Sequence, residues 1–173
     1  MEGKVDAMSE RPDHVDAIQE QWRRERPDLD PSPQGVIGRL HRVARALTDE
    51  LTSVYERYGL SEPEFDLLAS LRRTGPPFAL AAGELAAHTM VTTGGLTKRV
   101  DRLVDRGLVE REEVGDDRRR RLVRLTDAGR ALIDDAFTAH LANEHRLLAL
   151  VPAADANHLA HTLRSWSAAL GVD

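Results

Sequence analysis

Residues 89–129 decide the fold, and they read TMVTTGGLTKRVDRLVDRGLVEREEVGDDRRRRLVRLTDAG. The first half predicts a helix from Thr92 to Arg106, because its apolar residues recur at helical spacing and so share one face. A hydroxyl of Thr92 or Thr93 suits the start of this helix as a cap, and Gly107 suits its end as a left-handed residue. The predicted buried face consists of Leu96, Val100, Leu103 and Val104.

The second half of this stretch predicts a β-hairpin with a basic tip. Two β-prone runs, at 108–114 and 122–125, flank a Gly-Asp-Asp turn at 115–117. Arg residues occupy positions 118–121, directly after the turn. A helix with one buried face followed by an Arg-tipped hairpin is typical of a winged helix-turn-helix. In that motif the helix suits the major groove of DNA, and the hairpin tip suits the adjacent minor groove and phosphates.

The charge distribution supports this interpretation, although the net charge of −5 argues weakly against it. Residues 97–124 hold ten Lys and Arg against seven Asp and Glu, a local charge of +3, which leaves −8 for the remainder. DNA binding requires a local basic footprint rather than a basic protein. An Arg run alone is equally consistent with a solvated loop. Its position beside the predicted helix favours the DNA interpretation.

The exposed start of the predicted helix and the hairpin tip supply the expected DNA contacts. Lys98 can donate to guanine O6 and N7, and Gly94 lets the helix approach the groove floor. One Arg of the tip can enter a narrow minor groove while its neighbours meet phosphates. The predicted set is Thr92, Thr93, Gly94, Thr97, Lys98, Arg99, Arg102, Arg118, Arg119 and Arg120.

Two segments resemble the MarR family of multiple-antibiotic-resistance regulators. DRRRRLVRLTDAG at 117–129 resembles that family's wing and the following helix cap, where an Asp-Arg-Arg run precedes an alternating strand and a Leu-Thr-x-x-Gly helix start. TTGGLTKRVDRLVDRGLVER at 92–111 resembles its recognition helix, and the match covers nearly the whole chain. The resemblance implies a homodimeric transcriptional regulator that binds a pseudo-palindromic operator in double-stranded DNA.

The predicted architecture is mainly α, a single domain over 1–173 with a winged helix-turn-helix lobe and a helical dimerisation core. Residues 61–125 are expected to form the DNA-binding lobe, opened by a Ser61–Glu64 capping box. Helices over 34–58 and 127–170 carry apolar stripes that one subunit would leave exposed. Pairing two subunits through them buries the stripes and relates two recognition helices by two-fold symmetry.

An extra helix is predicted over 13–26, and its surroundings carry a narrower resemblance. QWRRERPDLDPSPQGVIGRL at 21–40 and EFDLLASLRRTG at 64–75 are similar to the MarR subgroup that responds to urate and to relatives that respond to small polycarboxylates. The resemblance implies a small anionic ligand (urate, xanthine or a polycarboxylate) held between the dimer core and the DNA-binding lobe. The matching positions are Trp22, Asp66, Arg99 and Arg111.

These residue types suit such a ligand, because a Trp face stacks on a flat purine and Arg clamps an anionic oxygen pair. By itself, Trp22 is better explained as an aromatic anchor that packs its helix, and the surrounding sequence favours the ligand role.

Several classes of function are disfavoured. The chain has no Cys, which excludes thiol chemistry. Its apolar runs are too short for a bilayer span, and an apolar signal segment is missing, so a cytoplasmic protein is expected. Histidines at 140, 145, 158 and 161 are expected on the surface, with no metal or other cofactor. No motif signals a nucleophile and base, so the chain is not expected to be an enzyme.

The expected function is therefore that of a repressor released from its operator by the ligand. The alternative is a winged helix used for protein–protein contact, or for DNA architecture without a ligand.

Overall fold

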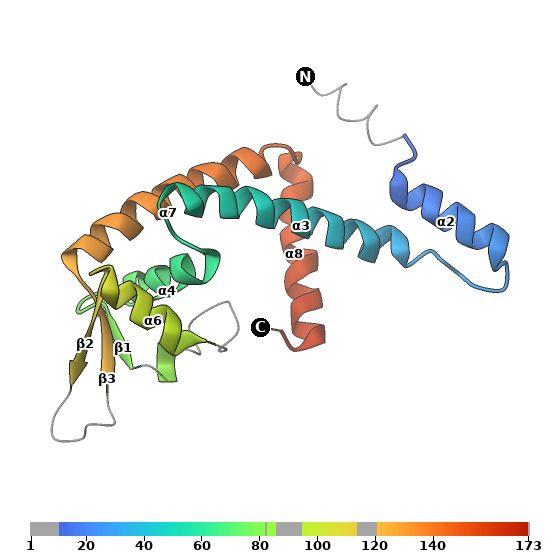
Figure 1. Ribbon diagram of the computed structural model, residues 1–173. Coiled ribbons are helices and arrows are strands. Elements are labelled where there is room, and N and C mark those ends of the chain that lie inside the picture. Colours follow the sequence, from blue (N-terminus) through green and yellow to red (C-terminus); the bar gives the residue numbers. More distant parts are fainter. Residues whose placement is uncertain (1–10, 82, 86–94, 114–120, 173) are drawn as a thin grey trace. The chain divides into compact units, whose positions relative to one another are not determined.

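Helices dominate the chain, and they accompany one small antiparallel sheet, as the sequence predicts (Figure 1). The computed structural model describes residues 11–81, 83–85, 95–113 and 121–172. The chain forms two compact units, Met1–Asp49 and Glu50–Asp173, and the boundary between them falls within helix α3 (Gln34–Arg57).

In the first unit, helix α2 (His14–Glu25) packs on the start of α3 through small residues. Val15 of α2 is buried, and its methyl groups would lie 3.5 and 3.7 Å from a Cβ at Gly38. Buried Gln19 donates from Nε2 to the carbonyl oxygens of Pro31 (2.9 Å) and Ser32 (3.2 Å). The connection between the two helices is therefore anchored to α2 by a hydrogen-bonded side chain.

A cluster of charged groups joins the start of α2 to α3. The Asp13 carboxylate caps α2 by accepting from the N–H groups of Val15 (2.8 Å) and Asp16 (3.0 Å). Arg39 of α3 donates from Nε to Asp13 (2.8 Å) and pairs with Asp16 (2.8 Å). The hydrogen bond from Arg39 holds the pKa of Asp13 well below its ordinary value.

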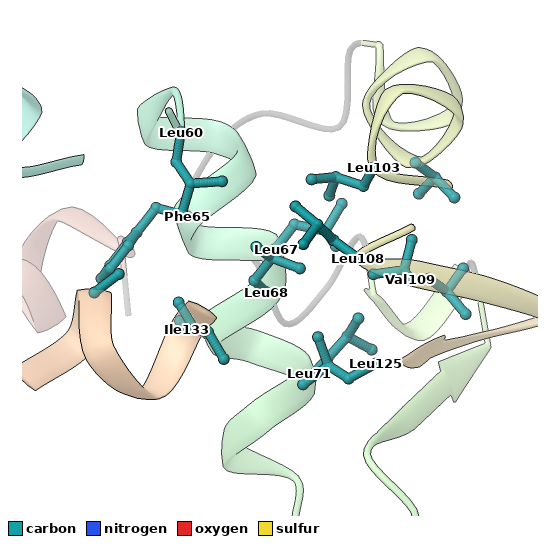
Figure 2. Packing of buried hydrophobic residues seen from close by; sticks show 14 of the residues in the cluster. Leu60, Phe65, Leu67, Leu68, Leu71, Leu103, Leu108, Val109, Leu125 and Ile133 are labelled. Atoms are coloured by element: carbon teal, nitrogen blue, oxygen red, sulfur yellow. The ribbon is translucent and has the colours of Figure 1, made fainter. Parts of the chain in front are cut away.

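In the second unit, helix α4 (Glu62–Arg73) forms the centre of the core (Figure 2). It opens with the predicted capping box: Glu64 accepts from the Ser61 N–H at 3.0 Å and from the Ser61 hydroxyl at 2.8 Å. Leu67, Leu68 and Leu71 of α4 are fully buried. The surrounding elements contribute Leu103, Leu108, Val109, Val123, Leu125 and Ile133 to the same cluster.

The sheet is the expected hairpin with one added strand. Strands β2 (Val109–Glu113) and β3 (Arg121–Leu125) pair antiparallel, and β1 (Ala79–Ala81) pairs with the other edge of β3. Val123 of β3 lies opposite Leu80 of β1 and Arg111 of β2. The predicted hairpin is thus confirmed, and the hairpin tip at 114–120 lies outside the described residues.

The helix before the hairpin, α6 (Leu96–Asp105), begins later than the sequence predicts. Gly95 precedes it with a left-handed φ of 83°, so a continuous helix from Thr92 is wrong. Thr92 and Thr93, predicted as caps, lie outside the described residues. Gly107 ends the helix with φ 66°, as expected.

Two long helices follow the hairpin. Thr126 caps α7 (Asp127–Leu148) by accepting from the Gly129 N–H at 3.0 Å, as predicted. Helix α8 (Ala153–Leu170) follows Pro152 and ends at left-handed Gly171. Within the described part of the chain, no side chain of α8 is buried. None of the described helices is both long and apolar enough to cross a membrane.

Candidate nucleic-acid interface

Helix α6 separates apolar from polar side chains as its periodicity requires. Val100 and Leu103 are buried against the core, while Thr97, Lys98 and Arg102 are exposed, and Arg99 is partly buried. These four polar residues are the described part of the predicted DNA-binding set. The other predicted members lie outside the described residues: Thr92, Thr93, Gly94, Arg118, Arg119 and Arg120.

Arg102 is held by a buried carboxylate of α4. Its Nε donates to Glu64 Oε1 at 3.0 Å, while about half of its side chain (55%) stays exposed. Burial raises the pKa of Glu64, but the hydrogen bonds from Ser61 and Arg102 together outweigh it, so the pKa lies below its ordinary value. Glu64 is therefore a carboxylate that faces the cationic side of α6.

A second cation, Arg106 at the C-cap of α6, lies near the same carboxylate. Arg106 Nη1 is 4.0 Å from Glu64 Oε2, and a Cβ at Gly59 would lie 3.5 Å from Arg106 Nη2. Arg102 and Arg106 are one helical turn apart, so they project from one side of α6. Two guanidinium groups thus surround one carboxylate, and the local charge remains positive.

Two further ion pairs involve the hairpin, one to α6 and one between its own strands. Arg111 of β2 donates from Nη2 to Asp101 Oδ1 of α6 at 2.6 Å. Arg124 of β3 pairs with Glu112 of β2 across the sheet. Arg111 was predicted to bind a ligand, and in this structure its partner is a carboxylate on the recognition helix. The wing and the recognition helix are therefore linked by charge as well as by packing.

The other predicted ligand residues lie in both units. Asp66 of α4 is nearly buried (8% exposed), and it and Arg99 of α6 both make polar or electrostatic interactions. Trp22 is on α2 in the first unit, with 46% of its surface exposed.

An aromatic cluster between α3, α4 and α7 contains residues that no local sequence pattern indicates. The rings of Tyr55 and Phe65 stack with centroids 4.1 Å apart, and Phe137 stacks on Phe65 at 6.3 Å. The His140 Nδ1 lies 3.2 Å from the Tyr55 hydroxyl, and its side chain is only 12% exposed. The prediction of a surface histidine at 140 is wrong, because these rings cover it.

The chain is similar to known proteins in sequence and in fold. A family model described as MarR family matches residues 58–120 of this chain. The HTH-type transcriptional regulator PecS of Dickeya dadantii (strain 3937) is 41% identical over 145 residues, which cover 84% of this chain and 87% of PecS. The chain belongs to the MarR family.

Other members of the MarR family extend the comparison. The HTH-type transcriptional repressor Mb2911 of Mycobacterium bovis is 32% identical over 124 residues, covering 72% of this chain and 86% of that protein. The crystal structure of a mutant MarR from Escherichia coli complexed with operator DNA matches with a TM-score of 0.65 and 27% identity, covering 76% of this chain and 95% of that one. AbsC of Streptomyces coelicolor shares the fold, with a TM-score of 0.73, 24% identity and coverage of 84% and 98%.

These matches define the general function of the MarR-family chain. It is a DNA-binding transcriptional regulator with a winged helix-turn-helix, and the relatives are regulators rather than enzymes.

Proposed function

We propose that this MarR-family regulator is a homodimeric repressor that leaves a pseudo-palindromic operator when it binds a small anionic ligand. The observation that carries the DNA part is the exposed face of α6. Thr97, Lys98 and Arg102 are exposed, while Val100 and Leu103 of the same helix are buried. An α-helix with this division fits the major groove, where Lys and Arg donate to guanine and to phosphates. A regulator that binds operator DNA would act in the cytoplasm.

Dimerisation is supported by apolar side chains that the described chain leaves exposed on three helices. Long helices with an uncovered apolar side are typical of subunit interfaces, because burial removes that surface from water. A two-fold dimer would also present two copies of α6 to two half-sites. The exposed apolar residues of these helices are Val36, Ile37, Val43 and Leu47 of α3, Phe137, Leu141 and Leu148 of α7, and Leu159, Leu163 and Leu170 of α8.

The ligand is proposed to be urate, xanthine or a small polycarboxylate, held by Trp22, Asp66, Arg99 and Arg111. The chemistry supports this set, since guanidinium groups bind anionic oxygens and an exposed indole offers a stacking face. An anion that recruits Arg111 would compete with Asp101, which now holds it at 2.6 Å. The ligand can change DNA affinity only by the difference in its own affinity for the two states of the protein.

A gel shift with DNA flanking the regulator's own gene tests the proposal. The protein should shift this DNA at concentrations that leave random DNA free, and one of urate, xanthine, citrate or aconitate should release it. Trp22→Ala should keep operator affinity while losing the ligand response, and Asp66→Ala should alter both. Leu29→Ala is the matched control, because Leu29 is an exposed apolar residue of the same unit (50%).

Three results would contradict parts of this proposal. Equal binding to operator and random DNA would argue against a specific operator at this site. Operator binding that no ligand affects would indicate a DNA-binding protein without this switch. A Trp22→Ala variant with the wild-type ligand response would return Trp22 to the role of a packing anchor.

A further inference from the structure

Glu64 links two helices, one that belongs to the core and one that is proposed to contact DNA. It belongs to the first turn of α4, a scaffold helix, and only 9% of its side chain is exposed. Its partner Arg102 belongs to α6, the helix proposed to enter DNA, and lies 38 positions away in sequence. A buried carboxylate that contacts the exposed face of a recognition helix is in a position to influence DNA binding without touching DNA.

The two oxygens of this carboxylate serve different partners. Oε2 accepts from the Ser61 N–H (3.0 Å) and from the Ser61 hydroxyl (2.8 Å), which completes the cap of α4. Oε1 accepts from Arg102 Nε at 3.0 Å. The cap of α4 therefore accounts only for the hydrogen bonds to Oε2. The hydrogen bond from Arg102 to Oε1 is a separate interaction of the same side chain.

We propose that Glu64 is a positioning residue for operator recognition, which fixes the guanidinium group of Arg102 at the orientation that the operator requires. This inference rests on the proposed function, because it takes Arg102 to contact DNA. A guanidinium group is planar, so a bond to Nε restrains the plane in which the remaining N–H groups lie. A cation restrained in this way loses less conformational entropy when it meets a base edge or phosphate in the same orientation.

The same contact affects discrimination between DNA sequences. An unrestrained Arg on an exposed helix face can bind any nearby phosphate, and such contacts make up the sequence-independent part of DNA binding. Glu64 offsets the charges of Arg102 and of Arg106, whose Nη1 is 4.0 Å away, and so weakens this general attraction. Glu64 should therefore increase the ratio of operator affinity to random-DNA affinity, which is the specificity of the regulator.

Glu64→Gln tests this directly, because Gln also completes a capping box but carries no charge. Glu62→Gln is the matched control: Glu62 is an exposed acid in the same helical turn, and the change in net charge is identical. Dissociation constants for operator and random DNA would be measured at several salt concentrations. Glu64→Gln should lower the operator-to-random ratio about threefold to tenfold, the range for losing one partly exposed charge-assisted contact. Glu62→Gln should leave the ratio unchanged.

Variants of Arg102 separate this inference from the proposed interface. If Arg102→Ala leaves operator affinity at the wild-type level, Arg102 is not a DNA contact and the inference fails, whereas the proposed operator binding is judged by the gel shift. If Arg102→Ala weakens binding while Glu64→Gln and Glu62→Gln give the same ratio, only the role of Glu64 is overturned. Within an Arg102→Ala background, Glu64→Gln should change the ratio much less than in wild type, because only the offset of Arg106 at 4.0 Å remains. An undiminished effect would overturn the proposed role of the bond to Arg102.

A second variant keeps the inference testable should Glu64→Gln fail to fold. Arg102→Lys leaves Glu64 and the charge of α6 intact but replaces the planar group with a flexible ammonium. The ratio should fall as in Glu64→Gln, and thermal unfolding should stay close to wild type. A wild-type ratio for Arg102→Lys would overturn the proposal, because orientation of the guanidinium group would then not matter.

Discussion

Gly129 lies so close to Leu108 that a Cβ at Gly129 would be 1.9 Å from the Leu108 carbonyl oxygen and 2.8 Å from its carbonyl carbon. The Thr126 hydroxyl fastens the same junction by donating to the carbonyl oxygen of Gly107 at 2.7 Å. The first turn of α7 is therefore joined, backbone to backbone, to the turn that connects α6 with β2. A displacement of α7 would carry the end of the recognition helix with it.

Replacing Gly129 with Ala should destabilise the protein. The added methyl group meets backbone atoms of Leu108, which cannot rotate away as a side chain would. Overpacking costs about 1–3 kcal/mol, and a clash with backbone should fall in the upper half of that range. Urea unfolding would measure it, with Gly83→Ala as control, because nothing lies within 4 Å of a Cβ there. Equal free energies of unfolding for the two variants would show that the backbone around Gly129 and Leu108 accommodates the methyl group at little cost.

Tyr55 should make the stability of the protein sensitive to alkaline pH. Burial, aided by the nearby carboxylates of Glu62 and Glu144, raises the pKa of Tyr55 from 10.0 to about 12. The folded state therefore favours the neutral phenol, and this contribution is complete below pH 10.0 and lost as pH rises towards about 12.

The measurement compares wild type with Tyr55→Phe. The difference between their free energies of unfolding should shrink across that alkaline interval, since Phe does not titrate. Absorbance of phenolate in Tyr58→Phe, which retains Tyr55, would report the pKa independently. A phenol that titrates near 10 in the folded variant would contradict the expected shift.

The local features of the fold were predictable because they depend on neighbours in sequence. The capping box of Ser61 and Glu64, the cap at Thr126 and the left-handed Gly107 follow from patterns spanning a few residues. Burial of Val100 on α6 likewise follows from helical periodicity. These signals are enough to predict the winged helix-turn-helix from the sequence alone.

The features that the sequence did not reveal depend on tertiary contacts. Nothing local distinguishes Gly129 from an ordinary helix glycine, because its neighbour Leu108 belongs to another element. The bond between Glu64 and Arg102 spans 38 positions, and only the packing of α4 against α6 brings the partners together. His140 has the sequence surroundings of a surface residue, yet aromatic rings from two other helices cover it.

Lys98→Ala should separate base reading from phosphate binding. Lys98 is exposed on the polar face of α6, where an ammonium group can donate to guanine O6 and N7. Loss of a specific base contact should cost about 1–3 kcal/mol on the operator and much less on random DNA. Titrations of both DNAs would measure this, with Arg24→Ala on α2 as a control for the lost charge. Equal losses on the two DNAs would assign Lys98 to phosphates.

Leu163→Arg should separate the subunits of the proposed dimer. Leu163 of α8 is 38% exposed in one chain, so an Arg there leaves the core of the second unit intact. If Leu163 lies in the subunit interface, the introduced guanidinium group would be buried there without a partner, and it should weaken association by about 3 kcal/mol or more. Sedimentation would detect monomers, and operator binding should fall with dimerisation. His161→Arg, on an exposed part of the same helix, should remain dimeric; a dimeric Leu163→Arg would place the interface elsewhere.

Helix α8 also bears on the lifetime of the protein in the cell. Over Ala153–Leu170 the described chain buries none of its side chains, and a helix without tertiary support is only marginally stable in water. In the proposed dimer the partner subunit would hold this helix folded, whereas in an unpaired subunit the helix would fray. Frayed termini are preferred sites of proteolysis. Degradation would then remove unpaired subunits of the proposed dimer first, so that the protein remaining would be mainly assembled.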